Sequence, residues 1–265
     1  MKNILIDTHA HLYVKSFGND REAMLKRADT EGVRKVYLPA IDSETHEAML
    51  ALEVEHPDFC TAMMGVHPCS INGETIENEL KIAEKYLTER PFCAIGEIGI
   101  DLHWDKTTFD VQKQAFIKQM HWAQSLGLPI IIHSRNSMEE VIAVLRENAW
   151  FTEGGILHCF TGNIEQAKQL IDMGFYLGIG GVVTYKNSGL DAVVAALDLK
   201  HLVLETDAPY LAPVPFRGKR NETSYVKHVA QKISEIKIVP YEEVARITTA
   251  NAETIFSKMS KPIVL

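Results

Sequence analysis

The run Asn3–His9 (NILIDTH) and the residues that follow it, Ala10-His11-Leu12, decide between two α/β folds. The apolar middle of this run is typical of a strand that is buried on both faces, as in a parallel sheet. A doubly wound sheet that binds a nucleotide would carry a glycine-rich loop directly after its first strand. Here that position holds His9-Ala10-His11. We therefore favour the other common arrangement of parallel strands, the closed barrel.

Apolar runs of the same kind, rich in Ile, Val, Leu or Phe, recur along the chain and predict seven further strands. They are Lys35–Pro39, Cys60–Val66, Phe92–Glu97, Pro129–His133, Gly155–His158, Phe175–Ile179 and Leu202–Thr206. Amphipathic segments with apolar residues every three or four positions predict helices between and after the strands. They include Arg21–Glu31, Ser43–His56, Glu77–Glu89, Phe109–Leu126, Ser137–Glu147, Glu165–Met173, Thr223–Glu235 and Tyr241–Ser257. Strands alternating with helices over about 250 residues predict a single (β/α)₈ barrel, one domain over residues 1–265.

Composition narrows the class of protein. The 265 residues are 46% hydrophobic and 23% charged, which is typical of a soluble globular chain. The net charge of −8 argues against a protein that grips nucleic acid through a generally basic surface, although it leaves room for a local basic cleft. No run approaches the roughly 18 apolar residues of a membrane helix. The 4 cysteines show no CxxC spacing. We expect a cytoplasmic monomer with no membrane contact and no obligate protein partner.

Titratable side chains gather where the predicted strands end, which is where such barrels carry their working residues. They are His9, His11, Glu97, His133, His158 and Asp207. His9 and His11 are two residues apart, so their side chains project to the same side of an extended backbone. Buried imidazoles and carboxylates are costly unless they are paired or bind a cation. The pattern predicts a divalent-metal cluster with nitrogen and oxygen ligands, and a carboxylate such as Glu97 can bridge two metal ions.

Each of these residues has an ordinary structural alternative when taken alone. His133 would be a hydrogen-bonded core histidine, Glu97 an interior acid held by an arginine, and Asp207 a cap of the following loop. Their coincidence at the ends of five strands favours the metal cluster.

Residues near the same strand ends are candidates for substrate binding. His67, in Gly65-Val66-His67-Pro68, is expected to contact a substrate phosphate or transfer a proton, and the alternative is a turn in which Pro68 stops the strand. Arg135 is expected to bind a phosphate. Further candidates for phosphate contact are Arg217, Lys219 and Arg220 in the last loop, with ordinary surface charge as the alternative. Trp104 would either stack on a base or pack on the barrel rim.

Taken together, the motifs resemble the TatD family of metal-dependent deoxyribonucleases, within the amidohydrolase-like barrels. The motifs are DTHAHL (Asp7–Leu12), GVHP (Gly65–Pro68), GEIGID (Gly96–Asp101), IHSR (Ile132–Arg135), LHCFTG (Leu157–Gly162), GIGG (Gly178–Gly181) and LETDAPYL (Leu204–Leu211). The resemblance implies one metal on His9, His11, Glu97 and Asp207, and a second on Glu97, His133 and His158. The family usually has proline where this chain has Thr223, and we expect that difference to loosen the loop before the next helix.

The resemblance implies a hydrolase of DNA phosphodiesters that uses two divalent cations, Mg²⁺, Mn²⁺ or Zn²⁺. Such a pair would bind the scissile phosphate and lower the pKa of the attacking water. Asp207 is the candidate general base, and Glu97 would hold the metals together. By resemblance, the substrate would be single-stranded or frayed DNA ends, cleaved 3′–5′.

Two other functions stay open. The first is hydrolysis of an amide or ester, such as a lactone, a cyclic amide or an aminoacyl ester, by a barrel of the amidohydrolase superfamily. Many of those barrels bridge their metals with a carboxylated lysine, and Glu97 at that position favours the phosphodiesterase branch. The second is a non-enzymatic binding module, which would have lost part of the ligand set, whereas all six candidate positions hold competent ligands.

Overall fold

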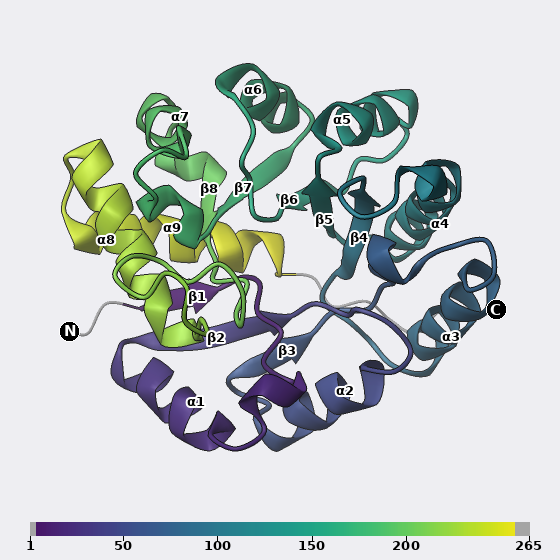
Figure 1. Ribbon diagram of the computed structural model, residues 1–265, viewed down its shortest axis with the longest axis horizontal. Helices are drawn as coiled ribbons and strands as arrows, with labels where there is room; N and C mark the ends of the chain where they lie inside the picture. Colours follow the sequence, from purple (N-terminus) through teal and green to yellow (C-terminus); the bar gives the residue numbers. More distant parts are fainter. Residues whose placement is uncertain (1–3, 258–265) are drawn as a thin grey trace.

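Eight parallel strands form the centre of the molecule, and helices surround them (Figure 1). The computed structural model describes residues 4–257. The strands are β1 (Leu5–Asp7), β2 (Val33–Leu38), β3 (Cys60–Ala62), β4 (Ile95–Asp101), β5 (Ile130–Arg135), β6 (Gly155–Leu157), β7 (Phe175–Ile179) and β8 (Leu202–Leu204). The predicted first strand began at Asn3, which lies outside the described residues. All eight predicted strands overlap an observed strand.

The strands close into a barrel through two short contacts. Continuous parallel pairing joins β1-β2-β3 and, separately, β4-β5-β6-β7-β8. Isolated parallel bridges connect these two sheets, Met64 with Ile95 on one side and Ala10 with Ala208 on the other. Backbone hydrogen bonds from Thr8 N to Leu204 O, 3.0 Å, and from Asp207 N to the His9 carbonyl, 2.9 Å, add to the second contact. The predicted (β/α)₈ barrel is confirmed.

Most of the helices surround the strands in Figure 1, whereas α9 crosses the centre of the view, against β1 and β8. They are α1 (Arg21–Thr30), α2 (His46–Glu55), α3 (Ile76–Glu89), α4 (Phe109–Leu126), α5 (Met138–Glu147), α6 (Ile164–Asp172), α7 (Leu190–Ala196), α8 (Val226–Lys237) and α9 (Tyr241–Ile255). Every predicted helix is present within a few residues, except that 223–225 form a separate 3₁₀ turn, η6 (Thr223–Tyr225), before α8. None of the helices within residues 4–257 has the length and apolar character that a membrane crossing needs.

Strand β4 differs from its prediction, and the difference matters for the site. The prediction Phe92–Glu97 ended the strand at its first charged residue, but β4 runs on to Asp101 and all seven of its residues are buried. Glu97 therefore lies within the strand. Gly99 has φ +140° and no side chain. A Cβ at this position would lie only 2.1 Å from the His133 carbonyl oxygen of β5, so only glycine permits this close approach of the two strands. This close approach brings the carboxylate of β4 and the imidazole of β5 together.

An apolar cluster fills the barrel interior beneath the polar strand ends. Successive strand residues alternate between this cluster and the larger core under the helices, as in β5, where Ile131 belongs to the inner cluster and Ile130 to the outer one. Phe256, directly after α9, stacks on Tyr37 of β2 with ring centroids 3.6 Å apart. The inner cluster leaves the opposite end of the barrel for polar side chains.

Candidate metal centre

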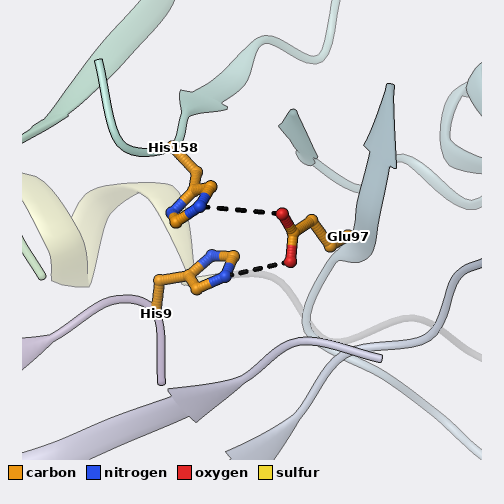
Figure 2. A group of neighbouring side chains, drawn as sticks. All are labelled: His9, Glu97 and His158. Atoms are coloured by element: carbon orange, nitrogen blue, oxygen red, sulfur yellow. Dashed lines mark ion pairs between the residues drawn. The ribbon is translucent and has the colours of Figure 1, made fainter. Parts of the chain in front are cut away.

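The carboxylate of Glu97 lies at the centre of a group of imidazoles at the C-terminal ends of the strands. Figure 2 shows His9 and His158 pointing at its two different oxygen atoms. His9 Nε2 is 3.1 Å from Glu97 Oε2, and His158 Nε2 is 3.6 Å from Glu97 Oε1. His9 follows β1, and His158 follows β6. The arrangement divides the site into two halves, one at each oxygen.

The half at Oε2 contains the residues that immediately follow β1 and β8. His11 Nε2 is 3.4 Å from Glu97 Oε2. Asp207 Oδ1 lies 3.8 Å from His9 Nε2 and 3.6 Å from His11 Nε2. These three side chains are close enough to share one metal ion. The structure thus brings together the residues that were expected to hold the first metal.

The half at Oε1 contains His133 and His158, as expected, and also His67. His133 Nδ1 is 2.8 Å from Glu97 Oε1, and His67 Nε2 is 3.4 Å from the same oxygen. His67 Nε2 and His133 Nδ1 are 3.2 Å apart. The sequence placed His67 with the substrate, whereas the structure also makes it available as a ligand beside His133 and Glu97.

The chemistry of this group fits a pair of cations. His9 and Glu97 are buried, and Glu97 Oε2 accepts no hydrogen bond from any residue of the described chain, despite the two imidazole nitrogens beside it. Burial alone would raise the pKa of Glu97, but the charges of His9, His67 and His158 outweigh it and lower that pKa well below its usual value. A buried carboxylate that stays ionised among converging imidazole nitrogens is a suitable bridge for divalent metals.

Polar partners on the far side of the imidazoles fix their orientation. Glu205 Oε1 is 3.1 Å from His158 Nδ1 and also accepts a hydrogen bond from the Cys159 backbone N–H at 2.6 Å. Burial alone would lower the pKa of His158, but the Glu205 and Glu97 carboxylates outweigh it and raise that pKa to about 10. Carboxylates behind metal-binding histidines set the ring orientation and increase the basicity of the ligand.

Asp101 orients His133 in the same way, although it was not among the predicted site residues. Its Oδ2 lies 2.9 Å from His133 Nε2. Asp101 is the last residue of β4, four positions after Glu97, so both side chains project from the same face of the strand. The alternation of side chains along a strand would have placed Asp101 beside Glu97, but only if β4 had been predicted at its full length.

Thr223, for which we expect a looser loop, is hydrogen-bonded to the end of β1. Asp7, fully buried at the end of β1, accepts hydrogen bonds from the Thr206 hydroxyl at 2.6 Å and the Thr223 hydroxyl at 2.5 Å. Thr223 therefore links the start of α8 to the residues that precede His9. Proline has no hydroxyl and could not make this contact.

The candidate phosphate-binding residues lie in different environments. Arg135 is exposed, and its Cζ is 5.3 Å from the ring centroid of Trp104, a residue that is 73% exposed. Trp104 is thus largely exposed and contacts Arg135 and His103 at its ring. Arg220 instead makes two hydrogen bonds to the Asp20 carboxylate, at 2.6 and 2.7 Å. Because this ion pair occupies its guanidinium, Arg220 does not fit the phosphate contact considered for it.

Gly178 in β7 provides the space for Glu205. A Cβ at Gly178 would lie 2.1 Å from Glu205 Oε2, whereas a Cβ at Gly180 would have nothing closer than 3.7 Å. We expect Gly178→Ala to displace the Glu205 carboxylate from His158 and weaken metal binding about 10–100-fold. Isothermal titration with Mn²⁺ or Zn²⁺ measures this, with Gly180→Ala as the matched control. Equal affinities for the two variants would refute the positioning role of Glu205.

A closed (β/α)₈ barrel with imidazoles and carboxylates converging at the C-terminal ends of its strands defines the class of metal-dependent hydrolases. The family model described as "TatD related DNase" matches residues 6–257, and the chain belongs to this family. It is 43% identical to the uncharacterized metal-dependent hydrolase YabD of Bacillus subtilis (strain 168), over 96% of this chain and 99% of that protein.

Two further comparisons agree. The chain is 29% identical to the 3′-5′ ssDNA/RNA exonuclease TatD of Erwinia tasmaniensis, over 96% of this chain and 100% of that protein. The crystal structure of YjjV, a TatD homolog from Escherichia coli K12, superposes with a TM-score of 0.86 at 30% identity, covering 97% of this chain and 100% of that one. The protein is thus a metal-dependent hydrolase of the TatD family.

Proposed function

We propose that this protein hydrolyses the phosphodiester bonds of DNA, as a 3′–5′ exonuclease on single-stranded or frayed ends. The observation that carries the proposal is the Glu97 carboxylate, whose two oxygens face two separate sets of imidazoles. Paired metal sites bridged in this way serve the in-line displacements of phosphate chemistry. The relative named as an ssDNA/RNA exonuclease supports the same substrate class.

In this proposal each half of the site holds one divalent cation, Mg²⁺, Mn²⁺ or Zn²⁺. His9, His11 and Asp207 would hold the first, His133 and His158 the second, and Glu97 would lie between them. When bound, the cations neutralise the scissile phosphate and lower the pKa of the attacking water. Asp207 is the candidate general base, because its side chain is 14% exposed whereas that of Glu97 is 2% exposed. Its carboxylate can therefore reach a water molecule at the mouth of the barrel.

The residues around the site would bind the rest of the phosphate. Arg135, exposed at the end of β5, would pair with a flanking phosphate oxygen. His67 Nε2 lies close to Glu97 and His133 and would bind either the second cation or a phosphate oxygen. We further propose that one domain, residues 1–265, acts as a monomer in the cytoplasm. The free state of Cys60, Cys69, Cys93 and Cys159 is compatible with a reducing compartment.

An amide or ester hydrolase is the second candidate, because the same donor atoms could serve attack on a carbonyl. Glu97, rather than a lysine, between the two halves favours phosphodiester substrates. A panel of lactones, cyclic amides and aminoacyl esters, assayed beside a labelled oligonucleotide, separates the two functions.

Removal of the metals is expected to abolish hydrolysis. We expect the purified protein to shorten a 5′-labelled single-stranded oligonucleotide one nucleotide at a time, to lose this activity after exhaustive chelation, and to regain it with Mg²⁺, Mn²⁺ or Zn²⁺. Elemental analysis before and after chelation gives the metal content. An unchanged rate in the metal-free protein, or cleavage of the amide panel alone, would contradict the proposal.

A further inference from the structure

A groove lies beside the loops that follow β7 and β8, and its lining extends onto α7 and α8. The first loop contains η4 (Gly181–Thr184) and the second spans 208–221. The Tyr185 hydroxyl donates a hydrogen bond to the Ala212 carbonyl at 2.9 Å, and Val214 N–H donates to the Thr184 hydroxyl at 2.9 Å. These contacts hold the loops side by side. The groove has a volume of about 430 Å³, and its lining includes Tyr185, Lys186, Asp191, Val214, Arg217 and Lys232.

Positive charge predominates in this groove, although the chain as a whole carries −8. Its lining contains three basic side chains, Lys186, Arg217 and Lys232, and one acidic side chain, that of Asp191. Arg217 and Lys186 are exposed, and no carboxylate among residues 4–257 pairs with either of them. Lys232 has only a distant partner, Glu235, at 4.0 Å. An unneutralised basic groove in an acidic protein is complementary to a polyanion.

The guanidinium of Arg217 is held in place by an aromatic ring. Its Cζ lies 4.4 Å from the ring centroid of Tyr185. In the same loop Arg220 is occupied by Asp20, so the two arginines have different environments. An arginine stacked on a ring keeps its donors free for phosphate oxygens, and less side-chain entropy is lost when it binds.

The second loop of the groove begins at the metal centre. The second loop starts directly after Asp207, and Tyr210 within it has its ring centroid 6.2 Å from that of His11. The two loops are in backbone contact, because a Cβ at Gly181 would lie 2.1 Å from the Leu211 carbonyl. A strand whose end is bound at the metals could therefore pass over the joined loops into the groove.

We propose that this groove, named here the Arg217 groove and defined by Tyr185, Lys186, Arg217 and Lys232, binds the sugar-phosphate backbone of the substrate strand beyond the nucleotide being hydrolysed. The inference rests on the proposed function and specifies which part of the substrate is held where. In this proposal Lys186, Arg217 and Lys232 contact successive phosphates, and the Tyr185 ring holds the Arg217 guanidinium in position. Affinity then increases with strand length and decreases with salt, while the bond-breaking step depends on the metal centre alone.

The test compares two double variants with the same change in net charge. Lys186→Gln/Arg217→Gln removes two cations from the Arg217 groove, and Lys81→Gln/Lys168→Gln removes two exposed lysines from α3 and α6 on the outside of the barrel. Each protein is assayed with bis(4-nitrophenyl) phosphate, which occupies only the metal centre, and with single-stranded 3-mer and 12-mer DNA. Fluorescence anisotropy of the labelled 12-mer measures binding in chelator, where no turnover occurs.

The groove variant is expected to raise KM and Kd for the 12-mer about tenfold, with the loss confined to the longer strand. The slope of log K against log salt should become shallower by about 1.4, since each single-strand phosphate contact contributes about 0.7. The outer variant should resemble the unmodified protein. If the two double variants had equal affinity for the 12-mer and equal salt slopes, the proposal that the Arg217 groove binds the substrate strand would be wrong. If no protein hydrolyses any phosphodiester, the proposed function has failed, and the anisotropy measurement still decides whether the groove binds DNA.

Discussion

Replacing Glu97 with glutamine is expected to lower the turnover of single-stranded DNA by about 10³-fold. Glutamine has nearly the same shape, but one of its two terminal atoms is an amide nitrogen that donates hydrogen bonds and cannot bind a cation. Whichever way the amide turns, one half of the site loses its shared oxygen. The bound metal should fall from two equivalents to one or fewer, as measured by elemental analysis, together with the loss in kcat.

A matched control separates this effect from a simple loss of negative charge. Glu165 is exposed on α6, outside the barrel, and Glu165→Gln makes the same chemical change there. That variant should keep its metals and its rate. Thermal unfolding of both variants checks that each one is folded. A Glu97→Gln protein with two metals and normal turnover would remove the basis of the two-metal proposal.

Replacing Asp207 with asparagine is expected to lower kcat about 10²–10³-fold while changing KM little. Asparagine keeps a carbonyl oxygen that can face His9 and His11, but it cannot accept the proton of the attacking water. The loss should therefore appear in the chemical step and not in substrate binding. Single-turnover kinetics on a labelled oligonucleotide measures this step directly.

Asp58 provides the comparison for Asp207, because it is exposed in the turn before β3, at the opposite end of the barrel. Asp58→Asn should turn over substrate at the unmodified rate. If the Asp207→Asn protein bound less metal and also had a lower kcat, the main role of Asp207 would be that of a metal ligand and not of a general base. A normal kcat would rule out both roles.

Much of the barrel was predictable because parallel strands buried on both faces leave a strong apolar signal. All eight strands were located, and Phe109–Leu126 matched α4 at both ends. The misplaced end of β4 has a physical cause. A charged residue normally marks the end of a buried run, but Glu97 is buried within the strand beside imidazoles contributed by other strands. The imidazoles that offset the cost of burying Glu97 come from distant parts of the chain, so the residues next to Glu97 in the sequence do not reveal them.

The site was predictable residue by residue but not in its internal arrangement. Six side chains were expected to meet because each follows or lies near the end of a strand, and the structure places all six together. The position of His67 beside His133 depends on how strands β3 and β5 lie on either side of β4, which no sequence spacing reveals. Asp101 was missed for the related reason that its strand was predicted too short.

The junction between β1 and β8 has a consequence for when the enzyme can complete its folding during synthesis. Thr206 and Asp7, which join across it, are 199 residues apart in the sequence. His9 and His11 are synthesised early, whereas Asp207 is available only after most of the chain has left the ribosome. A nascent or prematurely terminated chain that stops before Leu202 therefore lacks the junction and cannot complete its catalytic centre. Hydrolase activity is therefore withheld until translation is nearly finished.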